Sequence, residues 1–545
     1  MAQTRLVTGP PVASIELAIQ VYPAAILTLY SVICDTFPAL LTVFSRQVSR
    51  AFIVMVAGLC LRTRKPTARS IASTLGVVSH DALTRLLTHA SWNASLLMGA
   101  VLNQALLMTG GSPLPSYLIL DDVVIPKPFA RWIAGAYWDW DHAEKRKVFC
   151  HRVVVVVWTN GVVVLPVAFA LWHKRHSAYF LAPTASFTPD EYTALLATFQ
   201  HVTSLLSSVV QSQEDTVVLE IQRLSSSQKH LIGKDAFAVI ASHATNQHRY
   251  RTKNELARCL IYSVVRHGLC GEYITFDSWY ASQENLNFLT RLGLIYYAAI
   301  PCSRKVHSAF RVSSSTVLSF KPGSVSTLAA SHSTRAFIPY PQGHLRALAL
   351  LVNLPGLNHG AKLVMLKNRD WLRVLKHSLP ADHPLRQHKD KDPNTYLLTN
   401  NIVCPAYQVI LHYRSRWAIE VMFRNLKQHL GLGACQHRSL EAVTRHIALV
   451  LFAFVCLQLV RRDFVDSQPD QAATMTIGDV KKRLQSQVVV SGATVETRGI
   501  LTGEILPMPR DIFEQLTDPA GPAVISVLPP LTLESPAIKE LYSDA

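Results

Sequence analysis

Several features that mark particular protein classes are missing from this sequence. The nine cysteines are scattered, with no C-x-x-C pair and no Cys/His cluster at the spacing of a zinc site. Their distribution argues against a disulfide framework or a structural zinc, and it indicates reduced thiols in a cytosolic protein. The first residues also lack the order of a charged segment followed by an apolar one, so we expect no export through a signal peptide.

Uninterrupted apolar runs long enough to cross a membrane are missing as well. Residues 17–34 carry no charge, but Pro23 and several polar residues interrupt them. Residues 447–460 form an apolar run that includes Gln458 and is short for a bilayer, which needs about 20 residues. Both runs therefore predict buried helices, and we expect no membrane partner.

Acidic residues are scarce relative to basic ones. The 545 residues hold 36 Asp plus Glu against 53 Lys plus Arg, which gives a net charge of +17. This balance favours an anionic partner such as nucleic acid. The length allows roughly two to four domains with sizeable cores.

The most informative stretch is 413–427, YRSRWAIEVMFRNLK, which we predict to be one helix. It contains no Gly or Pro, and its residues are compatible with a helix interior. At ~3.6 residues per turn, four polar side chains fall within an arc of roughly 60°, namely Tyr413, Arg416, Glu420 and Lys427. The neighbouring arc predicts a face that packs on a core, formed by Ile419, Met422, Phe423, Leu426 and Leu430.

Two interpretations of this polar stripe compete. It can be a solvated charged face whose cations pair with Glu420. Alternatively, Glu420 holds a metal ion while its neighbours bind phosphate oxygens, because an acid flanked by two cations and a phenol suits that task. The position of the stripe beside the predicted core favours the second interpretation.

Further acids follow apolar runs that predict strands. A run at 116–120 leads into Asp121 and Asp122, and a later run at 272–276 leads into Asp277. An Asp at a strand end is unremarkable alone, since Asp often caps such ends. Together with Glu420, however, these acids form a set.

The segments between and after these acids also have readable patterns. Residues 151–158 and 162–170 predict a hairpin, and Asn160-Gly161 between them suits a type I′ turn. We expect helical segments around 189–213 and a crossover helix before Asp277. A helix from about residue 282 and a strand at 294–300 follow, and then a segment with further short strands. This order is that of an RNase H-like fold, in which the first and fourth strands lie side by side.

The acids suit the chemistry of phosphodiesters. Two hard cations about 3.5 to 4 Å apart can stabilise the attacking oxygen, the leaving oxygen and the charge on the phosphorus. Magnesium prefers oxygen ligands and needs few protein groups, so two Asp and one Glu suffice. One of Asp121 and Asp122, together with Asp277 and Glu420, could supply them.

The first 110 residues predict helices throughout. Residues 66–92 contain a helix, a break at 76–79 and a second helix that opens at Ser79 or His80. This spacing suits a DNA-binding helix-turn-helix with basic residues for phosphate contacts. An ordinary helical hairpin explains the pattern equally well.

The motif Tyr-x2-Arg-x3-Glu-x6-Lys at 413–427 resembles the signature of cut-and-paste DDE transposases of the insertion-sequence-four type. The resemblance runs from about residue 117 to residue 460. In that family an Asp-x-Thr sequence carries the first acid, whereas Val123 stands at the Thr position here. Alignment on this position and the Ile-Pro-Lys that follows favours Asp121 and leaves Asp122 as the alternative.

This resemblance implies an α/β fold with an RNase H-like mixed sheet flanked by helices, a strand-rich insertion and an all-helical N-terminal domain. We expect five segments: a DNA-binding domain (1–110), the first part of the catalytic core (111–301), the insertion (302–407), the final core helices (408–465) and a C-terminal tail (466–545).

The resemblance also implies a DNA transposase that cleaves and joins transposon-end phosphodiesters with two Mg²⁺ ions, for which Mn²⁺ can substitute. Asp121, Asp277 and Glu420 would be the catalytic metal ligands, and Tyr413, Arg416 and Lys427 would contact DNA phosphates. The implied partners are double-stranded DNA, as terminal inverted repeats and target, and a second copy of the chain on the DNA ends. The implied location is the cytoplasm of a prokaryote, in association with the nucleoid.

Two alternatives for the function remain at this point. The chain can be a domesticated or inactive transposase relative that binds DNA ends as a regulator, although its intact acids and motif count against this. It can also be a structure-specific nuclease.

The two aromatic residues after Asp277 also have two possible roles. For Trp279 and Tyr280, stacking on an unpaired base competes with core packing, and we predict core packing.

Overall fold

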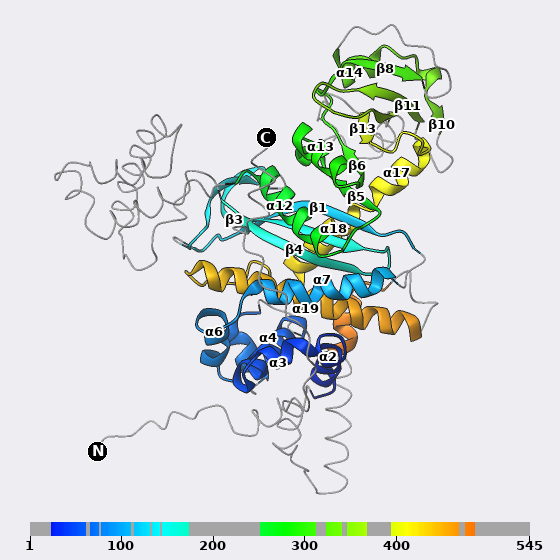
Figure 1. The fold of residues 1–545 in the computed structure, drawn as a ribbon. Coiled ribbons are helices and arrows are strands. Elements are labelled where there is room, and N and C mark those ends of the chain that lie inside the picture. Colours follow the sequence, from blue (N-terminus) through cyan, green and yellow to red (C-terminus); the bar gives the residue numbers. More distant parts are fainter. Residues whose placement is uncertain are drawn as a thin grey trace, which may run out of the picture.

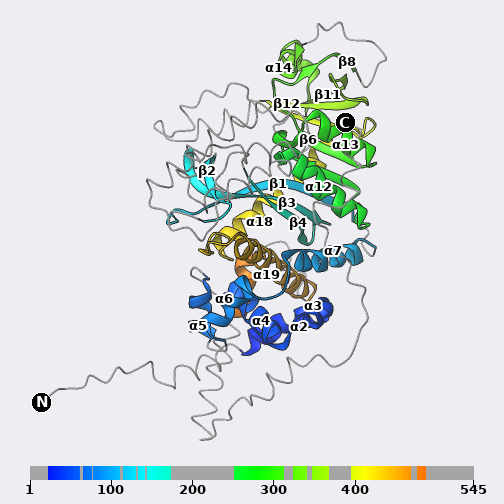
Figure 2. The ribbon, with the colours of Figure 1, turned by 60° about the vertical axis from the view of Figure 1, so that its left-hand side comes forward.

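The computed structural model is a layered α/β protein (Figure 1). It describes residues 23–61, 66–75, 78–110, 114–130, 133–141, 144–173, 251–311, 323–339, 346–367, 394–467 and 475–485. The helical segments predicted around 189–213 lie outside these residues. A mixed sheet forms the middle layer, with helices on both of its faces (Figures 1 and 2).

The centre of the sheet has the strand order that the sequence predicted. Its strands are β1 (Tyr117–Pro126), β3 (Arg146–Thr159), β4 (Val164–Trp172), β5 (Tyr273–Phe276) and β6 (Ile295–Ala299). β4, β3 and β1 pair antiparallel in that order, while β1, β5 and β6 pair in parallel. The first and fourth predicted strands therefore do lie side by side, as β1 and β5.

The β3–β4 hairpin is present, but the predicted type I′ turn is wrong. Such a turn needs positive φ at both central residues. Only Gly161, with φ of 84°, has it, and Asn160 does not. The side-chain oxygen of Asn160 instead accepts hydrogen bonds from the backbone N–H groups of Val162 and Val163 at 3.1 and 3.2 Å, which stabilises a longer loop.

One strand of the core was missed from the sequence, and the crossover helix was expected without bounds. The strand β2 (Tyr137–Asp141) pairs with β3 at the edge of the sheet. The crossover helix is α12 (Lys253–Arg266), which opens with a capping box between Thr252 and Glu255. It is followed by β5, a short 3₁₀ turn η3 (Ser278–Tyr280) and α13 (Gln283–Arg291).

The strand-rich segment extends the same sheet. β13 (Asn394–Thr399) pairs with β6, and β12 (Ala361–Lys367), β11 (Arg346–Asn353) and β10 (Ile338–Pro339) follow outward. Smaller elements complete this end: β7 (Lys305–Val306), β8 (Ser308–Arg311), β9 (Gly323–Ser324), α14 (Val325–Ala330) and η4 (Thr334–Ala336). The sheet thus runs without a break from the strands predicted as the core into residues predicted as an insertion.

The prediction of one continuous helix over 413–427 is wrong. Two helices replace it, α17 (Ala406–Arg414) and α18 (Trp417–Gln428). The hydroxyl of Ser415 donates to the carbonyl of His412 at 2.7 Å, and the backbone N–H of Arg416 bonds the carbonyl of Tyr413 at 3.1 Å. A Ser that bonds back to the preceding turn tightens a helix there, and this explains the break.

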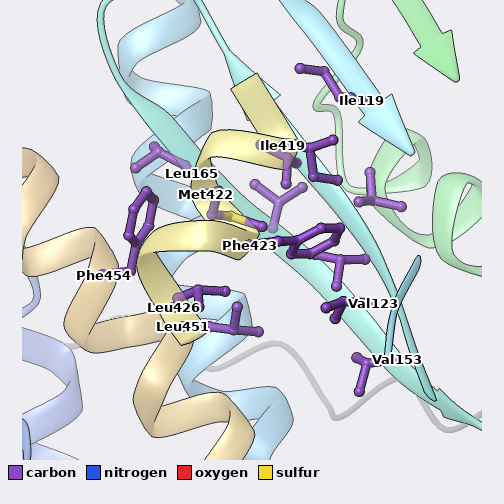
Figure 3. Close-up of a cluster of buried hydrophobic side chains, with 14 of the residues drawn as sticks. Ile119, Val123, Val153, Leu165, Ile419, Met422, Phe423, Leu426, Leu451 and Phe454 are labelled. Atoms are coloured by element: carbon purple, nitrogen blue, oxygen red, sulfur yellow. The ribbon is translucent and has the colours of Figure 1, made fainter. Parts of the chain in front are cut away.

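The predicted apolar face of α18 is buried. Ile419, Met422 and Leu426 have no exposed surface and pack between the sheet and α19 (Leu440–Ser467). Figure 3 shows this cluster, with Ile119 and Val123 of β1 on one side and Leu451 and Phe454 of α19 on the other. The register of α18 is therefore set by its apolar stripe.

The helix α19 is central to the core. It is the one helix among the described residues that is long and apolar enough to cross a membrane, yet 94% of its apolar window is buried inside the protein. Residues 447–460 within it are all buried, as predicted for a core helix. A further helix at 477–485 packs Val480 and Leu484 into the same core, so the predicted tail is structured in part.

The described residues before β1 form helices only. They are α2 (Pro23–Thr36), α3 (Pro38–Val43), α4 (Arg46–Leu61), α5 (Ala68–Leu75), α6 (His80–Thr88) and α7 (Ala94–Gly110). α2 to α6 lie on the side of α19 away from the sheet (Figures 1 and 2). They share one hydrophobic cluster with α19, so the structure does not delimit an N-terminal domain.

The predicted pair of short helices is present as α5 and α6. The hydroxyl of Ser79 caps α6 by accepting from the backbone N–H of Ala82. Arg445 of α19 donates to the carbonyls of Leu87 and Trp92, which fixes the end of α6 on α19. The structure therefore explains how the pair is held and leaves its binding role as a prediction.

Candidate active site

The two adjacent aspartates lie on opposite faces of the sheet. Both are inside β1, since the strand continues to Pro126 against β3. Successive strand residues point to opposite sides. Asp121 therefore shares a face with Ile119 and Val123, which pack near α18 (Figure 3), whereas Asp122 reaches Lys253 of α12 on the other face.

Asp121 lies beside Asp277. Leu120 and Phe276 form the last residue pair of the parallel β1–β5 ladder, and each aspartate comes directly after one of them. Burial, together with the negative charge of Asp277, raises the pKa of Asp121 to about 7. Burial also raises the pKa of Asp277, in spite of the hydrogen bond from the backbone N–H of Trp279. A buried carboxylate whose ionisation is disfavoured by a second carboxylate beside it forms a site that attracts a cation.

Arg416 connects Asp121 to the third acid. One guanidinium nitrogen lies 3.1 Å from Oδ2 of Asp121, and another pairs with Oε1 of Glu420. The break between α17 and α18 places Arg416 directly before the first turn of α18, where Glu420 lies. The guanidinium is mostly buried, with its side chain 17% exposed. The pairing with Glu420 that the sequence left open is therefore present.

Within the described residues, no three His, Cys, Asp or Glu side chains come together as an ion-binding group. Arg416 supplies the positive charge between Asp121 and Glu420 in this conformation. The donors nevertheless fit a divalent cation, because all three are carboxylates, and the Asp121–Asp277 pair carries more negative charge than Arg416 can neutralise. The chemistry of the donor set fits magnesium. Glu420 could join the two aspartates only after its ion pair with Arg416 opens.

The other two residues of the predicted stripe differ from each other. The ring of Tyr413 lies 5.8 Å from the guanidinium carbon of Arg416, and both residues line an open hollow with Arg414 and Trp417. Lys427 lies about two turns beyond Glu420 along α18. Lys427 is exposed, and partial desolvation lowers the pKa of its ammonium, against the charges of Asp141 and Glu144 at the sheet edge.

Asp122 belongs to a different set of contacts, which the sequence did not reveal. Its Oδ2 lies 2.5 Å from Arg152, and its Oδ1 lies 3.0 Å from Lys253 and 2.7 Å from the hydroxyl of Tyr280. Burial would raise the pKa of Asp122, but Lys253 and Arg152 hold it below its ordinary value. The capping box at Thr252 was the available signal for α12 and hence for Lys253.

Trp279 and Tyr280 differ in their exposure to solvent. Tyr280 is buried, at 1% exposure, as predicted, whereas Trp279 is 60% exposed, so core packing is the wrong prediction for it. The ammonium of Lys253 lies 4.2 Å from the centre of the Trp279 ring. Asp277 caps the turn that carries Trp279, because its side chain accepts from the backbone N–H of Trp279.

The mixed sheet, its strand order and the acids at its centre fit a DDE/RNase H-like fold. Comparison with protein families agrees: the Transposase DDE domain matches residues 240–456, and the DDE superfamily endonuclease model matches residues 39–182. These matches support a DDE-superfamily transposase, a nuclease-type enzyme of a class that typically uses divalent metals and acts on DNA. No curated protein matches the chain.

Proposed function

We propose that this protein is a DNA transposase of the insertion-sequence-four type, which cleaves and joins the phosphodiesters at transposon ends. The observation that carries the proposal is the placement of Asp121 and Asp277 at neighbouring positions of two parallel strands, with Glu420 joined to Asp121 through Arg416. Three acids from rigid elements on one side of a sheet are what two-metal phosphoryl transfer requires.

Asp121, Asp277 and Glu420 would hold two Mg²⁺ ions, with Mn²⁺ as a substitute. When bound, the ions would neutralise charge on the phosphate and activate the attacking oxygen. The chain itself supplies orientation. β1 and β5 fix the two aspartates relative to each other, and the buried stripe of α18 fixes the helix that carries Glu420.

Arg416 would then change partners. In this conformation its guanidinium compensates Asp121 and Glu420. Once cations take over that role, the guanidinium can bind two phosphate oxygens at once. Tyr413 would donate its hydroxyl to the same phosphate, and Lys427 would supply a point charge further along the backbone.

The proposed partners are double-stranded element ends and target DNA. The net charge of +17 supports an anionic partner. We assign end recognition to the α5–α6 pair, where Arg69 and Arg85 are exposed. A homodimer on paired ends and a prokaryotic cytoplasmic, nucleoid-associated location are part of the same proposal.

One assay tests this function. The protein, Mg²⁺ and a DNA fragment carrying the repeats that flank the gene should give 3′-hydroxyl ends and then joining of those ends to target DNA. Cleavage without joining would indicate a structure-specific nuclease. Specific binding without cleavage would indicate a regulator derived from a transposase. Absence of both binding and cleavage would contradict the proposal.

A further inference from the structure

Behind the candidate acid site, on the α12 side of the sheet, lies a cluster of four buried ions. Asp122 and Asp139 pair with Arg152 and Lys253, and the four side chains are between 8% and 14% exposed. The two acids and two bases balance in charge. They come from β1, β2, β3 and α12, so the cluster joins four elements at the middle of β1.

Stability alone does not account for such a cluster. Desolvation of four ions costs about as much as their attraction returns, and apolar side chains of similar volume often stabilise a core as well or better. Directional contacts give something that apolar packing lacks, which is a fixed position for each group. The contacts of Asp122 show which group is positioned.

Asp122 holds the turn that carries Asp277. The hydroxyl of Tyr280, the last residue of η3, donates to Oδ1 of Asp122 at 2.7 Å. The backbone N–H of Tyr280 bonds the carbonyl of Asp277 at 3.3 Å, and that of Trp279 bonds the Asp277 carboxylate at 3.0 Å. Lys253, which pairs with Asp122, also lies against the Trp279 ring.

The other end of the turn is fixed as well. The side chain of Asn285 in α13 donates to the carbonyl of Tyr280 at 2.9 Å and accepts from Arg258 of α12 at 2.7 Å. On the β1 side, Asp122 follows Asp121 directly, and its backbone N–H donates to the Asp121 carboxylate at 2.8 Å. One residue therefore reaches both aspartates of the candidate site.

We propose that Asp122 is a positioning residue: through Tyr280 and Lys253 it fixes Asp277 against Asp121. The inference rests on the proposed function, in which Asp121 and Asp277 are metal ligands. Asp122 itself holds no metal in this account, because both of its carboxylate oxygens already accept charged or hydroxyl donors.

Calorimetric titration of the full chain with MnCl₂ tests the proposal without a cleavage assay. Tyr280→Phe removes only the hydroxyl that reaches Asp122. Loss of a partner that orients a ligand typically costs 10- to 100-fold in metal affinity, so we expect Mn²⁺ affinity to fall about 10-fold or more. Asp122→Asn should lower it in the same direction.

A matched control lies one strand further on. Tyr296 of β6 is also fully buried, but its hydroxyl bonds Nε2 of His359 at 2.9 Å instead of one of the acids. Tyr296→Phe removes the same group at the same depth and should leave Mn²⁺ affinity at the wild-type value. Thermal melts of both variants without metal separate loss of stability from loss of positioning.

The outcomes distinguish the two proposals. The proposed function fails if the wild-type protein does not bind Mn²⁺, or if Asp121→Asn binds Mn²⁺ as well as the wild-type protein does. If wild-type protein binds and Tyr280→Phe binds equally well, the positioning role is overturned while the proposed function stands. Equal losses of affinity in Tyr280→Phe and Tyr296→Phe would also overturn it, because they would show general loosening of the sheet.

Discussion

Asp121 and Asp122 are adjacent in sequence, yet the two faces of the sheet treat them in opposite ways. On the α18 face, Asp121 lies beside a second aspartate and shares a single guanidinium with Glu420. On the α12 face, Asp122 meets a guanidinium, an ammonium and a hydroxyl. One face has surplus negative charge, and the other is balanced.

The comparison shows how one strand can carry a candidate metal ligand on one face and a structural acid on the other. Surplus charge destabilises the native state but attracts a cation, so it marks a site that binds something. Balanced charge attracts little and instead fixes geometry. A β-strand places the two environments at successive residues, because its side chains alternate between faces.

The largest expected effect is on the α18 face, which has the surplus of negative charge. Glu420→Gln removes a charge with almost no change in shape, and we expect strand cleavage to fall on the order of 1,000-fold or more, as for loss of a main charge-stabilising group. DNA-end binding should remain near the wild-type level. Nicking of a labelled element end in Mg²⁺ measures the first, and gel shift measures the second.

Arg424→Gln is the control for this variant, since Arg424 is an exposed residue one turn further along α18. It should cleave close to the wild-type rate. Cleavage by Glu420→Gln at the rate of this control would remove Glu420 from the site.

Folding stability should separate the two aspartates next. Asp122→Asn leaves Arg152 and Lys253 with one carboxylate between them, and breaking a buried pair in this way costs about 3 to 5 kcal/mol of unfolding free energy. Asp121→Asn removes repulsion from Asp277 and should leave the metal-free protein as stable as wild type or more so. Urea unfolding of both variants checks this, and equal destabilisation would erase the contrast between the faces.

The pH dependence of stability should have opposite signs on the two faces. The pKa of Asp121 is raised to about 7, from about 4 in the unfolded chain. The folded state therefore binds this proton more tightly, and its stability falls as pH rises from about 4 to 7. The lowered pKa of Asp122 acts in the other direction, so its contribution is lost as pH falls through that folded-state pKa.

Melting curves from pH 2 to 8 without metal test these signs by difference. Relative to wild type, Asp121→Asn should gain stability progressively up to pH 7. Asp122→Asn should lose most at neutral pH and least in acid. A constant offset for Asp121→Asn across this range would show that its carboxyl does not titrate there.

The smallest effect concerns the cations of the stripe. Affinity for a pre-cut end should fall with salt at a logarithmic slope of roughly −0.9 per phosphate contact. Arg416→Ala with Lys427→Ala should reduce the magnitude of that slope by about one to two units and weaken end binding. If Arg416 only pairs with Glu420, the double variant will melt lower with an unchanged slope.

Much of the fold was predictable because its signals are local. Alternating and apolar runs gave the core strands, and the apolar stripe of α18 gave its buried face. The break before α18 was missed because the back-bonding hydroxyl of Ser415 has no strong sequence pattern. The crossover helix was expected but its residues were not located, although Thr252 and Glu255 form a recognisable capping box at the start of α12.

The two aspartates could be told apart only by weak alignment, since the first strand was predicted to end before them. Their difference comes from partners far along the chain. Lys253 and Tyr280 lie 131 and 158 residues beyond Asp122. Arg416 lies 295 residues beyond Asp121. Such pairings depend on the topology of the sheet and leave no mark at fixed spacing in the sequence.

The central claim is that the α18 face performs DNA cleavage while the α12 face supports it. The most direct measurement is Mg²⁺-dependent cleavage of the flanking-repeat DNA by Asp121→Asn and Asp122→Asn under one set of conditions. We predict no detectable cleavage for Asp121→Asn and reduced but measurable cleavage for Asp122→Asn. Measurable cleavage by Asp121→Asn together with none by Asp122→Asn would contradict the account and make Asp122 the ligand.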